Sequence, residues 1–239
     1  MKQITWNLKP LFGGDDDPAM KKSRKLVFKE SYDFINKWKN RTDYLRDPSM
    51  LRKALDEYEL WRRKYGSDGN EGYYFSLRTA QDQNDPELKA RFNMVEDFGK
   101  KIENDIQFFS LRIAKIPEED QRIFLANESL KKYRHYLTRL FQEAKYLLSE
   151  PEERIMNLKA STSYSNWVRM TSSFLSREER DVLTVDGKKE RKSFSEIASL
   201  MNKKEKRVRD SAARAFNDIL DRNVDIAEAE INSVLANKK

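Results

Sequence analysis

Very few side chains in this sequence could do chemistry by themselves. The 239 residues include one histidine, His135, and no cysteine. A zinc site of the type His-Glu-x-x-His needs two histidines on one helix face, so this chain alone cannot form one. The lack of cysteine excludes disulfides, cysteine-bound metal clusters and thiol catalysis. We therefore predict no catalytic residue and no metal ligand in this chain.

His135 lies between aromatic residues, in the sequence Tyr-Arg-His-Tyr-Leu at positions 133–137. A lone histidine in such surroundings is more often packed and hydrogen bonded than used as a base. No serine lies in a Gly-x-Ser-x-Gly sequence, where a nucleophile would be expected. We therefore expect His135 to be a structural residue.

Three consecutive aspartates, Asp15, Asp16 and Asp17, could suggest a metal-binding loop. A calcium loop needs oxygen ligands at alternating positions, a glycine at its sharp turn and a distal glutamate, and this spacing is absent. Carboxylates are favourable at the start of a helix because the helix dipole is positive there. The three aspartates are therefore expected to form a solvated cap on the first helix.

A basic segment, residues 174–216, resembles the region-4 helix-turn-helix of bacterial sigma factors. In such a motif the second helix enters the major groove, and Arg207, Arg209 and Arg214 would face DNA. The turn of the motif needs a small and then an apolar residue, whereas this sequence has an asparagine followed by a lysine. A DNA-binding module is therefore the alternative function.

The overall charge argues against nucleic acid as a partner. The 47 Lys and Arg residues exceed the 40 Asp and Glu residues by seven, and both signs are spread along the chain. This pattern is typical of helices with salt-linked, solvated faces. No apolar run approaches the roughly 20 residues of a membrane span, and the N-terminus lacks the apolar core of a signal peptide. We expect a cytoplasmic protein without a membrane partner.

Helices dominate the expected secondary structure. Asp-Pro pairs at positions 17–18, 47–48 and 85–86 mark helix starts, because aspartate caps free N–H groups and proline is tolerated in the first turn. Apolar residues then recur at three-to-four spacing. The expected helices cover about 18–41, 48–65, 73–78, 86–115, 118–125, 128–146, 150–160 and 161–176.

One strand pair interrupts this pattern. Asp186 and Gly187 separate two short runs within residues 182–192, which predicts a β-hairpin. Ser193 and Glu196 have the spacing of a capping box, and a last long helix is expected from about Lys203 to the C-terminus. The predicted fold is all-α, an irregular antiparallel helical bundle with one small β-hairpin near 182–192.

Short sequence pieces along nearly the whole chain carry a second resemblance. In chain order they are Trp6-Asn7-Leu8 with Leu11-Phe12, Tyr73-Tyr74-Phe75-Ser76-Leu77-Arg78 with Asn84-Asp85-Pro86, Tyr133-Arg134-His135-Tyr136-Leu137, Leu147-Leu148-Ser149-Glu150, Ser163 with Trp167, Asp186-Gly187, Phe194-Ser195-Glu196 with Leu200, and Arg207-Val208-Arg209 with Ala212-Ala213. Together they resemble, in the same order, the N-terminal region of oligoendopeptidase F, in the M3 family of zinc metallopeptidases. The chain ends before the His-Glu-x-x-His motif of that family.

The resemblance implies a function that this chain would serve only in part. In that family the N-terminal helical region forms one wall of a deep channel around the active site, and the parent enzyme cleaves short peptides with one zinc ion. The implied partner is the C-terminal catalytic lobe of the same polypeptide, and no residue here corresponds to a zinc ligand or to the base. We expect residues 1–115 to form N-terminal helical hairpins and residues 116–239 a second subregion of one continuous lobe.

This interpretation predicts three properties of the chain alone. It should bind no catalytic zinc, have no peptidase activity, and present an apolar surface that the missing lobe would cover. The last helix is the candidate for that surface, through an apolar stripe made of Val208, Ala212, Ala215, Phe216, Ile219 and Ile226. Exposed apolar patches of this kind favour self-association and dye binding.

Overall fold

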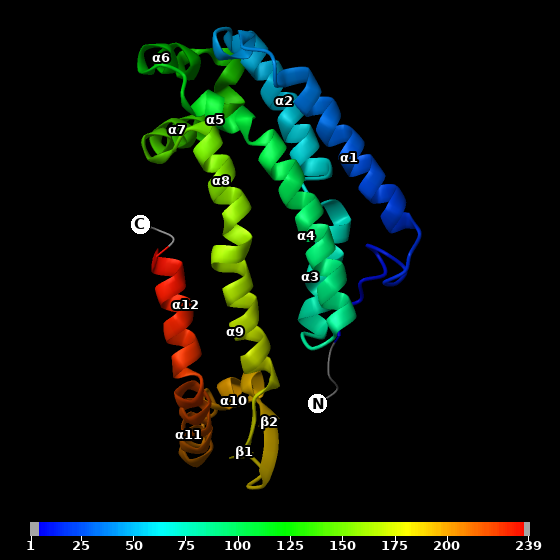
Figure 1. The fold of residues 1–239 in the computed structure, drawn as a ribbon, viewed down its shortest axis with the longest axis vertical. Coiled ribbons are helices and arrows are strands. Elements are labelled where there is room, and N and C mark those ends of the chain that lie inside the picture. Colours follow the sequence, from blue (N-terminus) through cyan, green and yellow to red (C-terminus); the bar gives the residue numbers. More distant parts are fainter. Residues whose placement is uncertain (1–4, 237–239) are drawn as a thin grey trace. The chain divides into compact units, whose positions relative to one another are not determined.

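The computed structural model describes residues 5–236, apart from the side chain of Ser161. The chain forms two compact units, which are described separately (Figure 1). Unit 1 contains residues 1–82 and 86–158, and unit 2 contains residues 83–85 and 159–239. The predicted boundary between residues 115 and 116 lies inside unit 1. The division of the lobe at this boundary stays a prediction.

All the regular secondary structure of unit 1 is helical. Its elements are α1 (Ala19–Trp38), η1 (Asp43–Leu45), α2 (Pro48–Lys64), α3 (Gly69–Gln81), α4 (Pro86–Ile106), α5 (Phe108–Ala114), α6 (Glu118–Ala126), η2 (Glu128–Tyr133), α7 (Arg134–Glu143), η3 (Ala144–Tyr146) and most of α8 (Glu150–Ala160). Helix α1 packs on α2, α3 and α4, and α3 packs along α4 (Figure 1).

The helix starts predicted from Asp-Pro pairs are confirmed. The Asp47 carboxylate accepts a hydrogen bond from the Ser49 backbone N–H at 2.9 Å, and Pro48 occupies the first turn of α2. Proline has no N–H to lose at this position, and its fixed φ angle is already helical. The pair at 17–18 precedes α1, where the Asp17 carboxylate accepts from the Ala19 backbone N–H at 2.8 Å, and α4 begins at the proline of the pair at 85–86.

Aromatic side chains form the centre of unit 1. Trp38, Tyr44 and Phe109 are fully buried, and Trp38 contacts Tyr44 edge-to-face with ring centroids 5.7 Å apart. The indole N–H of Trp38 donates to Glu57 at 2.9 Å, and that of Trp61 donates to the buried Ser31 hydroxyl at 2.9 Å. Buried indoles are stable in such a core because their N–H groups find acceptors.

The prediction of one continuous helix over residues 86–115 is wrong. The structure has two helices there, α4 and α5, which are separated at Gln107. Ile106, Phe108 and Phe109 are all buried. Residues so close in sequence point in different directions on a straight helix, which turns 100° per residue. The break allows all three side chains to reach the core. The helix predicted over 128–146 likewise consists of η2, α7 and η3.

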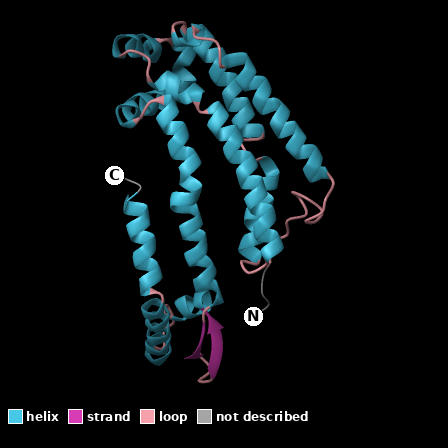
Figure 2. Ribbon diagram, in the orientation of Figure 1, coloured by secondary structure: helices cyan, strands magenta, loops and turns pink. Residues whose placement is uncertain are grey.

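Unit 2 carries the only sheet of the described residues (Figure 2). Its elements are η4 (Ser161–Ser165), α9 (Asn166–Arg177), β1 (Glu179–Leu183), β2 (Lys189–Ser193), α10 (Phe194–Leu200), α11 (Lys206–Arg222) and α12 (Val224–Ala236). The strands pair antiparallel, with Glu179 opposite Ser193 and Leu183 opposite Lys189. The predicted hairpin is therefore confirmed, although β1 begins three residues earlier. The capping box of Ser193 and Glu196 is also present.

The long last helix of the sequence analysis is interrupted at Asn223, between α11 and α12. The Asn223 side-chain amide donates to the Ile219 carbonyl at 2.8 Å. A short polar side chain can bind the carbonyl four residues earlier in this way and compete with helical backbone bonds. The predicted continuation of this helix over residues 237–239 lies outside the described residues. The all-α fold with one small hairpin is confirmed.

Candidate functional site

His135 is exposed on α7, and the described residues offer it no hydrogen-bond partner. The expectation that it is packed is therefore wrong, since α7 turns its buried residue, Leu137, to the core instead. Within residues 5–236, no group of three histidine, cysteine, aspartate or glutamate side chains could hold a metal ion. No described helix is long and apolar enough to cross a membrane.

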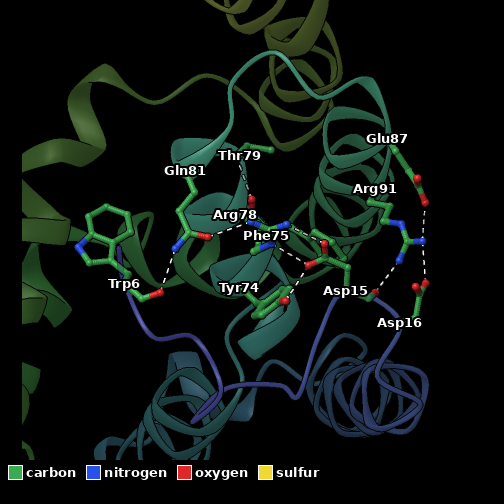
Figure 3. Close-up of polar contacts among 10 residues, drawn as sticks. All are labelled: Trp6, Asp15, Asp16, Tyr74, Phe75, Arg78, Thr79, Gln81, Glu87 and Arg91. Atoms are coloured by element: carbon green, nitrogen blue, oxygen red, sulfur yellow. Dashed lines mark hydrogen bonds and ion pairs between the residues drawn. The ribbon is translucent and has the colours of Figure 1, made fainter. Parts of the chain in front are cut away.

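The aspartate run before α1 is held by α3 and α4 (Figure 3). Asp15 receives two hydrogen bonds of 2.8 Å from the Arg78 guanidinium, one on each carboxylate oxygen. The Tyr74 hydroxyl donates to the same carboxylate at 2.7 Å. Tyr74 and Arg78 lie four residues apart on α3, so both side chains project from one helix face. We call Asp15, Tyr74 and Arg78 the Asp15 clamp.

The Asp15 clamp continues toward the N-terminus. Arg78 also donates to the side-chain oxygen of Gln81 at 2.9 Å, and the Gln81 amide donates to the Trp6 carbonyl at 3.0 Å (Figure 3). The Phe12 ring packs edge-to-face on Tyr74, with centroids 5.6 Å apart. The Tyr-x-x-x-Arg part of the motif that carried the family resemblance therefore fastens residues 6–15 to α3.

The electrostatics of the Asp15 clamp suit a structural link rather than proton transfer. Hydrogen bonds from Arg78 lower the pKa of Asp15, against the opposing effect of burial. Burial and the hydrogen bond to Asp15 raise the pKa of Tyr74 to about 12. At neutral pH the carboxylate is therefore charged and the phenol is neutral, and neither group titrates near pH 7.

The expected solvated cap is right for Asp17, whereas Asp15 and Asp16 bind arginines of α3 and α4. The Asp17 carboxylate accepts from the backbone N–H groups of Gly13 and Ala19 at 2.7 and 2.8 Å, and Asp16 is exposed. Asp15 instead points into the molecule, because Arg78 supplies a matching bidentate partner there. Arg91 of α4 binds this segment from the other side, donating to the Asp15 carbonyl and to Asp16 at 2.5 and 2.7 Å.

A cavity of about 630 Å³ lies among α2, the end of α4, α5, η2 and α7. We call it the aromatic cavity, and it is lined by Leu55, Tyr58, Glu59, Arg62, Arg63, Glu103, Ser110, Tyr133, Tyr136 and Leu140. Tyr133 and Tyr136 come from the Tyr-Arg-His-Tyr-Leu motif. The cavity could not be predicted from this motif, because most of the other lining residues lie up to about 80 positions earlier in the chain.

Tyr133 joins η2 to α2 at the edge of the aromatic cavity. Its hydroxyl lies 2.6 Å from an Asp56 carboxylate oxygen and 2.7 Å from one of Glu59. Burial and these two carboxylates raise the pKa of Tyr133, so the phenol stays protonated as a donor. Arg52 lies over the ring, 5.5 Å from its centroid. The tyrosine is therefore fixed in orientation by charges on α2.

The segment predicted as an alternative DNA-binding motif contains a packed helix pair, and one of its predicted DNA-facing arginines is bound within it. Phe194 of α10 stacks on Phe216 of α11 with centroids 5.0 Å apart. Arg209 donates to the carbonyls of Lys203 and Lys204 at 2.9 and 2.7 Å. One of the three predicted DNA-facing arginines therefore holds the turn between the helices.

Comparison with known proteins supports the other resemblance. Residues 112–177 match the family model of the M3 peptidase N-terminal region, described as oligopeptidase F. The fold is similar to the crystal structure of oligoendopeptidase-F from Enterococcus faecium, with a TM-score of 0.69 and 15% identity over 92% of this chain and 41% of that chain. A putative peptidase from Chlamydophila abortus gives a TM-score of 0.51 at 16% identity, over 96% and 38% of the two chains.

This chain is shorter than the solved structures that it resembles. It spans about two fifths of the length of the solved structures it resembles, and no curated protein matches the sequence. The matched residues 112–177 contain the Tyr-Arg-His-Tyr-Leu motif. The DNA-binding alternative finds no support, and the resemblance of this chain to the N-terminal region of oligoendopeptidase F is confirmed by a family match and by a common fold.

Proposed function

We propose that this chain is the N-terminal helical lobe of an oligoendopeptidase F-like zinc metalloendopeptidase that hydrolyses short peptides in the cytoplasm. The observation that carries the proposal is the fold match over 92% of this chain, which leaves more than half of the solved oligoendopeptidase-F unmatched. In the proposed enzyme the lobe encloses the substrate, and the catalytic lobe follows in the same polypeptide.

The residues of this chain do not fit a zinc site. Its single histidine is exposed, and no cluster of three metal-binding side chains exists between residues 5 and 236. A catalytic zinc site in proteins has three protein ligands and one open position. No chemical step is therefore assigned to residues of this chain, and the proposal gives zinc and the general base to the catalytic lobe.

Unit 2 offers a surface that the catalytic lobe could cover. Helices α9 and α12 contact each other, and neither has a fully buried residue. Their exposed apolar side chains are Val168, Met170 and Phe174 on α9 and Val224, Ile231 and Leu235 on α12. Soluble proteins rarely leave contiguous apolar surface uncovered unless a partner binds there. The stripe predicted on residues 208–226 is mostly buried within unit 2, and we therefore assign the surface for the catalytic lobe to α9 and α12 instead.

The coding sequence after residue 239 tests the proposal directly. We expect a His-Glu-x-x-His motif within the following few hundred codons. The extended protein should cleave a quenched fluorescent oligopeptide and lose this activity with 1,10-phenanthroline, whereas residues 1–239 alone should not cleave it. A stop codon at position 240, or an extended protein without the motif, would refute the proposal.

The exposed surface on α9 and α12 gives a second test. The chain of residues 1–239 should bind the dye 8-anilinonaphthalene-1-sulfonate, and the double substitution Phe174→Gln and Ile231→Gln should weaken the fluorescence. The control is Val185→Thr, which changes an apolar residue of the hairpin turn that is about as exposed as Ile231. Equal dye signals from the control and the double variant would show that α9 and α12 do not form the apolar surface.

A further inference from the structure

A second cavity, of about 430 Å³, lies between the turn that joins α2 to α3 and the helix α4. We call it the Lys100 cavity, and its charged lining residues are Arg62, Asp68, Glu96, Lys100 and Glu103. Its volume is within the range of about 300–1,000 Å³ that is common for small-molecule sites. All its lining residues belong to unit 1, so the cavity does not depend on unit 2.

The ammonium nitrogen of Lys100 lacks a hydrogen-bond acceptor. The side chain is 35% exposed, but Nζ itself is buried and has no hydrogen-bond partner among the described residues. Its closest carboxylate oxygen, on Glu96, lies 3.9 Å away, beyond the range of about 2.7–3.2 Å for a hydrogen bond. A buried ammonium group without acceptors is unfavourable, and such groups are normally satisfied by water or by a ligand. The cavity beside Lys100 is a space in which such an acceptor can lie.

The lysine and the turn opposite it leave room for this contact. The lysine stem has four carbons, and its bonds rotate between staggered positions. A rotation near the end of the stem can therefore bring Nζ from its buried position to the cavity. Gly66 of the turn has a φ angle of +62°, and a Cβ atom there would meet no atom within 4 Å. The wall is therefore open on the side of the turn.

The charges that line the cavity favour a cation over an anion. Arg62 and Lys100 contribute two positive charges, and Asp68, Glu96 and Glu103 contribute three negative ones, so the net charge is −1. Arg62 lies 3.6 Å from Glu103, and this pair is neutral as a whole. An excess of carboxylate repels an anionic ligand and attracts a cationic one. A ligand with one positive charge balances the lining, provided that it also carries an oxygen acceptor for Lys100.

Few small organic groups combine a positive charge with an acceptor. An alkylamine has the charge but no oxygen, and a carboxylic acid has oxygens but the opposite charge. The amino end of a peptide has both, because one carbon atom separates its ammonium group from the first carbonyl. An amino sugar also has both, since its ammonium group is next to hydroxyl groups.

We propose that the Lys100 cavity binds a primary ammonium group with a neighbouring uncharged oxygen, the ammonium on Asp68 and Glu96 and the oxygen on Lys100. In this exchange of partners the ligand replaces Lys100 beside Glu96 and supplies the acceptor that Lys100 lacks. A short peptide and an amino sugar are the two sources of this chemistry. The inference rests on unit 1 alone and does not depend on the proposed function, and a peptide source would connect the two.

Titration of residues 1–239 with four probes, followed by amide NMR, tests the ligand chemistry. L-alanyl-L-alanine amide and D-glucosamine carry both features, n-butylamine carries only the charge, and N-acetyl-L-alanyl-L-alanine amide carries only the oxygens. The amides of Gly66 and Gly99 report on the cavity wall, and that of Gly187 in the hairpin is the internal control. We expect the preferred source to bind at least about tenfold more tightly than n-butylamine and the acetylated peptide, because each lacks one charge-assisted contact. The stronger of the first two probes identifies the source.

Two variants locate the binding site. Lys100→Met should abolish the preference for the oxygen-bearing ligand over n-butylamine, a relative loss of about tenfold. The same variant should strengthen binding of n-butylamine, because the net charge of the lining falls from −1 to −2. Glu96→Gln should weaken binding of both amines. The matched controls are Lys101→Met and Asp97→Asn, which change exposed charges next to these residues that do not line the cavity.

The outcomes separate a binding site from a structural role. Each variant is first compared with the native chain by circular dichroism and by tryptophan emission, so that loss of folding is recognised. Stronger binding of n-butylamine together with a lost preference in Lys100→Met supports the proposal, since general destabilisation would weaken binding of every probe. Equal binding of n-butylamine and both oxygen-bearing amines to the native chain, an unchanged preference in Lys100→Met, or no saturable shift at Gly66 and Gly99 would overturn it.

Discussion

Removal of the Arg78 guanidinium by the substitution Arg78→Met should detach the segment before α1 from α3. The two bonds of 2.8 Å to Asp15 are lost, while the aliphatic part of the side chain is retained. Arg78 and Asp15 are 27% and 28% exposed. Exposed ion pairs contribute about 0–1 kcal/mol, and breaking a buried pair costs about 3–5 kcal/mol because an unpaired charge remains. The intermediate exposure therefore gives an expected loss of about 2 kcal/mol.

Urea unfolding followed by tryptophan fluorescence measures this loss, because Trp38 and Trp61 are buried in the core of unit 1. A double-mutant cycle with Asp15→Asn isolates the pair from other effects of each substitution. We expect a coupling free energy of about 1–2 kcal/mol at pH 7. The control is Lys29→Met, which removes an ion pair with side chains 67% and 60% exposed and should cost less than about 0.5 kcal/mol.

The pH dependence of this coupling follows from the lowered pKa of Asp15, whose largest cause is the hydrogen bonding from Arg78. A carboxylate with a lowered pKa in the folded state contributes stability above its unfolded pKa, about 3.9. That contribution is lost as the pH falls through the folded pKa. The coupling should therefore be constant between pH 7 and about pH 5 and decrease in stronger acid. A coupling at pH 7 no larger than that of the exposed control pair would refute this reasoning.

Three further substitutions test packing in the two units. Arg24→Met leaves the buried carboxylate of Glu71, which is 3% exposed, without its cation, and should lower the urea midpoint by an amount equivalent to about 3 kcal/mol. Gly99→Ala places a methyl group 2.9 Å from the Asp68 side chain, and calorimetry should show a loss of about 1–2 kcal/mol. Gly187 has a φ angle of +82° and open space around it. Gly187→Ala should therefore lower the stability of the β1–β2 hairpin by about 1 kcal/mol through backbone strain alone. Hydrogen exchange of the hairpin amides measures this loss.

Local sequence determined where most elements begin and what type they are. Asp47 and Pro48 start α2 by contacts within four residues, and Ser193 and Glu196 start α10 in the same local way. Asp186 and Gly187 form the hairpin turn because glycine adopts the positive φ angle that the turn requires. These features could be predicted because the interacting groups are neighbours in the chain.

Helix continuity could not be predicted from periodicity. Ile106, Phe108 and Phe109 are all apolar, and a three-to-four pattern passes through them without a signal for the break at Gln107. The break exists because the core of unit 1 accepts all three side chains at once. The interruption at Asn223 does have a local signal, because an asparagine side chain can bind the carbonyl of Ile219, four residues earlier.

The helical class, the hairpin and the family resemblance of this protein could be predicted because all three depend on residue types at short spacing. Which side chains meet across long distances depends on the tertiary structure. Asp15 binds Arg78 across 63 positions, and Tyr58 meets Tyr136 in the aromatic cavity. Periodicity identifies the apolar face of each helix, but the choice of its partner depends on the packing of all the helices together. Neither the Asp15 clamp nor the cavity could therefore be inferred before the helices were assembled.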